Sequence, residues 1–292
     1  MDRLFDLLLV SDLKGIGKKT IHKKYLEAIR RSKDTEDLVS NYLPRIKAIP
    51  KADINNSIER VKTSMEEIRD ASDVEVITCL SNRYPKKLLK LGDSAPLILY
   101  ARGNLEALGS NSVAVVGTRK PSPHSEKVER NLVSKIIELD GTKAIVSGLA
   151  IGCDEIAHRT ALQNNGITVA VLPSGVKNIV PAKNRELAEE IVSQNGCLVS
   201  EYPINTDATR WSFVERDGLI AALADATVVM ECGINSGTMH TVRKASELQK
   251  PIACYWPIDF AKGSYEGNAY MIEKMGAKPL GNTEALKRLL ML

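Results

Sequence analysis

The sequence predicts an α/β protein in which a Rossmann-like, doubly wound and mostly parallel sheet follows a small, all-helical N-terminal domain. From Ser112 onward, short and nearly continuous apolar runs alternate with stretches of helical periodicity. Such runs are typical of parallel strands that helices cover on both faces. Before about residue 70, leucines and isoleucines recur at helical spacing among many charged residues, and no convincing strand is found.

The length of 292 residues leaves room for two domains. We expect a helical domain of the helix-hairpin-helix or SAM-like kind over 1–70, a linker and extension of the core over 71–112, and the Rossmann-like core over 113–292. From Leu13 to Thr20 the chain reads Leu-Lys-Gly-Ile-Gly-Lys-Lys-Thr, which resembles the hairpin of a helix-hairpin-helix unit. Glycines there let the backbone turn tightly and point amides at a DNA phosphate. The same pattern also occurs as a plain turn between packed helices.

The expected elements follow one another in a regular order. An apolar run at 97–100 indicates a short strand before the core. The strands expected in the core are 113–116, 143–147, 168–172, 197–200, 226–230 and 251–255. The helices expected between them are 125–139, 152–164, 184–194, 214–223 and 237–249, and residues 282–292 read as a final short helix.

Composition favours a reducing compartment and an anionic partner. The formal net charge is +4, but eight lysines and arginines fall between Ser11 and Lys33, against only Asp12 and Glu27. This local excess indicates either an anionic partner or a solvated helix face. The five scattered cysteines fit buried, reduced thiols. No apolar run is long enough to cross a bilayer and the N-terminus does not read as a signal sequence, so we expect a cytoplasmic protein with no membrane partner.

Two glycine-containing motifs follow the first two core strands. The first is Gly117-Thr118-Arg119, whose hydroxyl and guanidinium suit a phosphate. The second runs from Ser147 to Gly152, where Gly148 and Gly152 would let a ligand backbone approach closely. Because doubly wound folds bind ligands at the carboxyl ends of their strands, both motifs predict a phosphate-binding surface.

Cations and an aromatic residue gather after the later strands. The segment after the third core strand carries Lys177, Lys183 and Arg185. Trp211 stands between Arg210 and Arg216, where it could either stack a base or pack within a loop. Ser236-Gly237-Thr238 leads into a helix whose first amides have no acceptor within the helix. These features extend the predicted anion-binding surface.

The same motifs argue against several enzyme classes. There is no G-x-G-x-x-G and no acidic residue in the ribose-binding position, which argues against an NAD site. Asp154 and His158 share one face of a predicted helix, and a structural hydrogen bond there is favoured over a catalytic pair. No strong nucleophile, general base or metal cluster accompanies them. We therefore expect a protein that is not an enzyme, with no catalytic residues, no metal and no cofactor.

Taken in this order, the motifs resemble those of the DNA-processing protein A family (DprA, also called Smf). The similarity runs from about Arg83 to Ala277. The residues that carry it are Tyr84-Pro85, Gly103-Asn104, Val116 to Arg119, Ser147 to Ala150, Gly152, Asp154, Ala157-His158, Asn184, Ser200 to Pro203, Glu231, Ser236-Gly237 and Pro251. Each piece is short, and the combination is what makes the resemblance specific.

The resemblance implies a core that binds single-stranded DNA in a basic pocket, forms a homodimer and helps load RecA onto DNA during natural transformation (competence) and recombination. The family's pocket arginines correspond to Arg119 and Arg216, and a pocket lysine corresponds approximately to Lys183. From the motifs and the resemblance together, the expected DNA contacts are Gly117, Thr118, Arg119, Ser147, Gly148, Gly152, Lys177, Lys183, Asn184, Arg185, Arg210, Arg216, Ser236, Gly237 and Thr238.

The chain also departs from the family pattern, which makes it a diverged member. Arg216-Asp217-Gly218 stands where the family has Arg-Asn-Arg, so one arginine is lost and an acid is gained. We expect no C-terminal winged-helix domain, which some members carry.

Two alternative functions stay open. One is a nucleotide-binding or nucleotide-hydrolysing protein of the lysine-decarboxylase-like (LOG) type, for which Glu231 leaves some room. The other is a DNA sensor in defence against foreign DNA.

A homodimer interface is expected at the end of the last predicted core strand. The stretch Pro251–Trp256 is largely apolar, and Pro257, Ile258 and Phe260 follow it. Large apolar groups just beyond a strand end are candidates for an interface anchor, or for a capped edge of the core.

Overall fold

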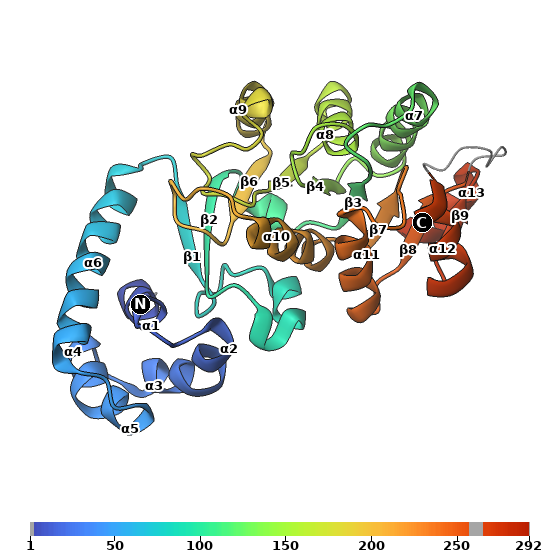
Figure 1. The fold of residues 1–292 in the computed structure, drawn as a ribbon. Coiled ribbons are helices and arrows are strands. Elements are labelled where there is room, and N and C mark those ends of the chain that lie inside the picture. The colour runs from blue at the N-terminus through green and yellow to red at the C-terminus, as the bar shows by residue number, and fades with distance from the viewer. Residues whose placement is uncertain (1–2, 257–264, 292) are drawn as a thin grey trace. The chain divides into compact units, whose positions relative to one another are not determined.

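Seven of the described strands form a parallel sheet in the larger part of the chain (Figure 1). The structure, a computed structural model, describes residues 3–256 and 265–291. The seven strands are β3 (Ser112–Val116), β4 (Ala144–Ser147), β5 (Thr168–Val171), β6 (Cys197–Ser200), β7 (Ala226–Val229), β8 (Ile252–Tyr255) and β9 (Lys278–Leu280). Across the sheet they run in the order β6-β5-β4-β3-β7-β8-β9, and each neighbouring pair is parallel.

Helices cover both faces of this sheet, which confirms the predicted doubly wound α/β fold (Figure 1). One face carries α7 (Pro123–Leu139), α8 (Cys153–Gln163) and α9 (Arg185–Ser193), and the other carries α10 (Arg210–Leu223) and α11 (Thr238–Glu247). The last two described helices, α12 (Glu266–Met275) and α13 (Thr283–Leu290), pack against β8 and against α7 respectively.

The strand order changes direction between β3 and β7. Successive strands from β3 to β6 are added on one side of β3, and the chain then crosses to its other side to form β7. The loops that leave β3 and β7 therefore diverge at the carboxyl edge of the sheet. In doubly wound folds this switch point is where ligands bind.

The chain divides into two compact units, the first comprising Met1–Tyr84 with Leu91–Tyr100 and the second Pro85–Lys90 with Ala101–Leu292. The first unit is mainly helical, and β1 (Glu75–Thr78) also belongs to it. The helical segments before β1 are α1 (Leu4–Asp12), α2 (Lys18–Thr20), η1 (Ile21–Tyr25), α3 (Leu26–Arg31), α4 (Thr35–Asp37), η2 (Leu38–Tyr42), α5 (Leu43–Ile46) and α6 (Lys51–Asp70). Leu7, Ile21 and Tyr25 are among the side chains fully buried in this unit. Along the chain, η3 (Lys86–Ser94) and β2 (Ile98–Gly103) have residues in both units, and η4 (Leu105–Leu108) follows in the second.

Helix α10 begins at Arg210, four residues before the predicted start. A capping box explains the difference: Thr209 Oγ1 accepts a hydrogen bond from the Ser212 amide at 3.1 Å, and Ser212 Oγ accepts one from the Thr209 amide at 2.8 Å. Trp211 and Phe213 therefore lie in the first turn of α10 and not in a loop before it. Trp211 is largely exposed, so it does not pack within a loop.

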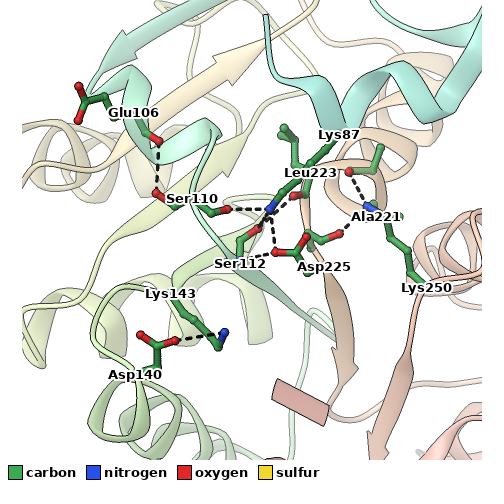
Figure 2. A network of polar contacts seen from close by, with 12 residues as sticks. Lys87, Glu106, Ser110, Ser112, Asp140, Lys143, Ala221, Leu223, Asp225 and Lys250 are labelled. Atoms are coloured by element: carbon green, nitrogen blue, oxygen red, sulfur yellow. Dashed lines mark hydrogen bonds and ion pairs between the residues drawn. The ribbon is translucent and has the colours of Figure 1, made fainter. Parts of the chain in front are cut away.

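A polar network ties together the amino ends of β3 and β7 (Figure 2). The Lys87 ammonium donates to the Ser110 carbonyl at 2.7 Å and to an Asp225 carboxylate oxygen at 2.8 Å. The same Asp225 oxygen accepts from the Ser112 amide at 2.9 Å. Because Ser112 begins β3 and Asp225 immediately precedes β7, the network fixes the two strands that flank the switch point.

A second lysine closes the far end of α10. The Lys250 ammonium donates to the carbonyls of Ala221, Ala222 and Ala224, which lie in the last turn of the helix and just beyond it (Figure 2). A cation is favourable there because the final carbonyls of a helix have no partner within it. Burial lowers the pKa of Lys250 to about 8.

We expect Lys87→Met to destabilise the second unit by about 1–3 kcal/mol, because it leaves the Ser110 carbonyl and Asp225 without their charged donor. Urea denaturation at neutral pH measures the change. The control is Lys90→Met, which alters an exposed lysine three positions away. Equal stabilities for the two variants would contradict the structural role of the network.

Candidate nucleic-acid interface

A pocket of about 470 Å³ lies at the switch point, at the carboxyl ends of β3 and β7. Its walls come from the end of β3 and the loop after it, the start of α8, helix α10, and the beginning of α11. The lining residues are Val116, Gly117, Thr118, Arg119, Ala150, Asp154, Phe213, Val214, Arg216, Asp217, Ile220, Ser236, Gly237, Thr238, His240 and Thr241. Seven of the fifteen predicted DNA contacts are therefore brought together in one pocket.

The turn after β3 is held tightly against neighbouring backbone. The Thr118 amide donates to the Glu231 carbonyl at 2.7 Å, and Thr238 Oγ1 donates to the Gly117 carbonyl at 2.9 Å. A Cβ on Gly117 would lie 2.5 Å from the Cys153 sulfur, so only glycine fits at this position. These contacts join the loops that leave β3 and β7 and fix the backbone from which Arg119 extends.

Arg119 is the exposed cation of the pocket. Its guanidinium carbon lies 5.6 Å from the centre of the Phe213 ring, within the range of a cation–π contact. Its side chain is thus placed beside an aromatic face while its nitrogens stay accessible to an incoming anion.

Arg216 also lines the pocket, but it is only 4% exposed. One guanidinium nitrogen donates to the Gly148 carbonyl and lies 3.8 Å from an Asp154 carboxylate oxygen, and Nε lies 3.2 Å from an Asp217 oxygen. A Cβ on Gly148 would collide with this guanidinium, which explains why a glycine stands there. The contacts of Arg216 make it a support of the pocket wall.

Two carboxyl groups oppose the arginines. Burial raises the pKa of Asp154, although the Arg216 guanidinium acts in the other direction. Burial likewise raises the pKa of Asp217 to about 6, against the opposing effect of Arg216. The charge of the pocket therefore depends on the protonation of these acids, and on Asp217 in particular near neutral pH.

Three predicted contacts of the second glycine motif do not line the pocket and have roles within the protein. Ser147 is fully buried and donates to the Val115 carbonyl at 2.7 Å. Gly148 makes room for Arg216. Gly152 has a φ of +83°, and a Cβ there would lie 2.6 Å from the Thr118 carbonyl oxygen. The close approach predicted at Gly152 is thus made by the protein's own backbone.

The remaining predicted cations also lie outside the pocket lining. Lys177, Arg185 and Arg210 are exposed, and Lys183 has a carboxylate oxygen of Glu155 at 3.9 Å. Asn184, at the end of η5 (Ala182–Asn184), is buried and donates to the carbonyls of Leu149 and Ala150 at 3.0 and 3.3 Å.

The pocket contains residues that sequence reasoning did not assign to it. They are Val116, Ala150, Asp154, Phe213, Val214, Asp217, Ile220, His240 and Thr241. The signal that could have found the α10 members is helical spacing: Phe213, Asp217 and Ile220 recur at intervals of three and four residues, as one face of a helix requires. That signal was hidden because α10 was predicted to begin after Phe213.

Asp154 and His158 do not form a pair. His158 is fully buried, and its Nδ1 shares a hydrogen bond of 2.7 Å with Thr168 Oγ1. Burial lowers the pKa of His158 to about 3, so the ring is neutral at physiological pH. Asp154 instead accepts from the amides of Gly148 and Ala150 at 3.1 and 3.3 Å. The structural hydrogen bond expected at His158 is present, but with a different partner.

Comparison with known proteins identifies the family. A sequence model described as DNA recombination-mediator protein A matches residues 75–290. The chain belongs to this family. The match confirms the resemblance seen in the sequence motifs.

Curated relatives of this family are about one third identical to the chain over the residues that align. Protein Smf of Escherichia coli is 36% identical over 197 residues, which are 68% of this chain and 51% of the relative. The DNA processing protein DprA of Streptococcus pneumoniae is 34% identical over 200 residues, 68% of each chain. The chain spans about half the length, or less, of the first curated relatives that it matches.

Solved structures of the family share the fold. The X-ray structure of S. pneumoniae DprA aligns with a TM-score of 0.81 at 25% identity and covers 97% of this chain and 96% of that one. DNA processing protein A of Helicobacter pylori, whose structure was described for its single-stranded DNA binding mode, aligns with a TM-score of 0.66 at 30% identity and covers 75% and 95%.

No group of three or more His, Cys, Asp or Glu side chains among the described residues is placed to hold a metal ion. None of their helices combines the length and the apolar character that a membrane span needs.

We expect Arg216→Met to lower the free energy of unfolding by about 3 kcal/mol or more, because it leaves Asp154 buried without its cation and the Gly148 carbonyl without a donor. Arg119→Met serves as the control, since this exposed arginine should change stability by about 0.5 kcal/mol or less. Urea denaturation compares the two. A larger loss for Arg119→Met would reverse the roles assigned to the two arginines.

Proposed function

We propose that the protein binds single-stranded DNA and acts in DNA uptake and recombination, with the switch-point pocket as its DNA site. The observation that carries the proposal is the exposed Arg119 guanidinium, which lies beside the Phe213 ring in the lining of the pocket. A guanidinium suits a phosphate, and an aromatic face suits a base. A recessed pocket also admits one backbone more easily than the two of a duplex.

The beginning of α11 supports an anionic ligand. Ser236, Gly237 and Thr238 line the pocket at this helix N-terminus. Aligned peptide dipoles favour negative charge there. The α11 dipole therefore adds to the effect of Arg119.

The finer parts of the proposal follow the family. We infer that the protein protects single-stranded DNA, helps load RecA and has no catalytic step of its own. A RecA strand-exchange assay on DNA coated with single-strand-binding protein tests the loading role. A cytoplasmic location is inferred with these roles, and cell fractionation tests it.

A homodimer is part of the same inference. Of its predicted anchor, Pro251–Trp256 lies in the described region, where β8 supplies the buried Ile252 and Ala253, while Pro257, Ile258 and Phe260 lie outside it. Light scattering of the full chain at micromolar concentration tests the dimer.

The alternative of a nucleotide hydrolase gains little from the geometry. Glu231 is buried, and its carboxylate accepts hydrogen bonds from the amide and hydroxyl of Ser122, both at 2.9 Å. Ser122 in turn caps α7. Glu231 thus has a structural role in holding the start of α7. Release of the base from nucleoside monophosphates would be the observation that favours a hydrolase. A DNA sensor in defence and a protein of natural transformation would both bind DNA at the pocket. They would differ in the partner protein.

We expect Arg119→Ala to weaken binding of a fluorescent single-stranded oligonucleotide by about tenfold or more, since a charge-assisted contact contributes about 1.5–3 kcal/mol. Fluorescence anisotropy across a salt series measures affinity, which should fall as salt rises. The control is Arg288→Ala, an exposed arginine on α13 that is outside the pocket lining and is not among the expected DNA contacts. Unchanged affinity in Arg119→Ala would place the site elsewhere.

DNA affinity should also depend on pH through Asp217. Because the pKa of this carboxyl is raised to about 6, it is largely protonated below pH 6 and ionised above it. Ionisation adds a negative charge beside the arginines, so affinity should fall as pH rises from about 5 to 7.5. Asp217→Asn should bind more tightly at pH 7.5 and flatten this profile. A profile with the same slope in both proteins would show that another group is responsible.

A further inference from the structure

A group of lysines in the first unit is left without acidic partners. Gly15 and Gly17 lie in the turn between α1 and α2, and Lys14 and Lys19 stand exposed on either side of it. Lys47 reaches the same turn from the end of α5, where its ammonium lies 3.5 Å from the Lys14 carbonyl oxygen. Within the described part of the chain, no carboxylate forms an ion pair with Lys14, Lys19 or Lys47.

The backbone of the turn brings Lys47 close. Gly15 has a φ of +73°, which side-chain-bearing residues rarely adopt, and a Cβ there would lie 3.2 Å from the Lys47 nitrogen. Leu13, Ile16 and Ile21 are buried and anchor the turn in the helical core. The lysines therefore surround a fixed, exposed piece of backbone.

The two acids of this basic segment are already committed elsewhere. Asp12 binds Arg60 of α6 through two hydrogen bonds to the Arg60 Nε and one to a terminal nitrogen. This contact with Arg60 lowers the pKa of Asp12, so the carboxylate stays ionised and paired. Glu27 pairs with Arg31 at 2.7 Å. Neither acid is left to neutralise the lysines around the turn, so the positive charge there is available to an outside anion.

We propose that Lys14, Lys19 and Lys47, around the Gly15–Gly17 turn, form a second DNA contact that grips the phosphate backbone and does not read bases. The site offers ammonium groups on an exposed turn and no aromatic side chain, so it has the means to bind phosphates but not to stack bases. It should therefore accept duplex and single strand alike, unlike the recessed pocket. It does not depend on the pocket, although both sites serve the proposed role on DNA.

The surroundings favour a nucleic acid over a lipid surface. Membrane-surface binding by basic segments is strengthened by large apolar side chains that enter the bilayer. Among the described residues, the exposed large apolar side chains all belong to the second unit. The lysine group of the first unit therefore offers a partner charged side chains and exposed backbone, but no large apolar side chain.

The test uses the full chain with Arg119→Ala, which removes the main cation of the pocket and leaves the lysine group as the site examined. In this background, Lys14→Gln, Lys19→Gln and Lys47→Gln are combined. The matched control combines Lys62→Gln, Lys127→Gln and Lys274→Gln, three exposed lysines on α6, α7 and α12 that change the net charge equally. Fluorescence anisotropy with a duplex of about 20 base pairs follows binding over a salt series.

The lysine-group variant should bind the duplex about tenfold more weakly at low salt than the control, and the slope of log affinity against log salt should fall in magnitude by about 3. Equal affinity and slope in the two variants would overturn the proposal. Loss of binding to vesicles rich in phosphatidylserine, with duplex binding unchanged, would overturn it in favour of a lipid surface. The pocket is judged separately by the effect of Arg119→Ala alone on single-stranded DNA, so either site can fail without the other.

Discussion

The pocket depends on one buried guanidinium. Arg216 extends from α10 to the Gly148 carbonyl, at the loop after β4, and lies between the carboxylates of Asp154 and Asp217. It thereby links a helix on one face of the sheet to the loop that leads into α8 on the other. A buried cation needs such partners, because its desolvation is otherwise too costly. The glycine at 148, the buried acid at 154 and the spacing of α10 from the loop after β4 all follow from accommodating this side chain.

The division of labour between Arg119 and Arg216 follows from their surroundings. Both are arginines near the same pocket, and both guanidinium carbons lie within 6 Å of the centre of the Phe213 ring. Arg216 is enclosed and neutralised, whereas Arg119 remains exposed. A guanidinium that is already paired with carboxylates of the protein contributes little positive potential to a bound ligand. The positive potential that the pocket offers to an anion therefore comes mainly from Arg119 and from the α11 terminus.

Much of the core could be predicted from the sequence, because local pattern and burial coincide there. Val113–Val116 and Val169–Val171 are apolar runs short enough to be strands, and each lies in a strand of the structure. β9 could not be found in this way, since only one of its residues, Leu280, is buried and no apolar run marks it.

The site was harder to predict than the core. Ser147, Asn184 and Arg216 all point into the protein. Contacts between segments far apart in the chain decide this, and no local sequence pattern reveals such contacts. By contrast, the sequence contains the capping pair Thr209 and Ser212. This pair predicts a helix start at Arg210, which places Phe213 on α10.

The two ends of α10 are held from opposite edges of the sheet. The Thr209–Ser212 capping box fixes its start beside the pocket, while the Lys250 ammonium holds its last carbonyls at the edge where β3 and β7 begin. A helix fastened at both ends transmits displacement along its axis as a rigid rod. The position of Phe213 is thus set partly by Lys250, which does not line the pocket. A substitution in the segment joining α11 to β8 would therefore reach the pocket through α10, although it alters no residue of the pocket wall.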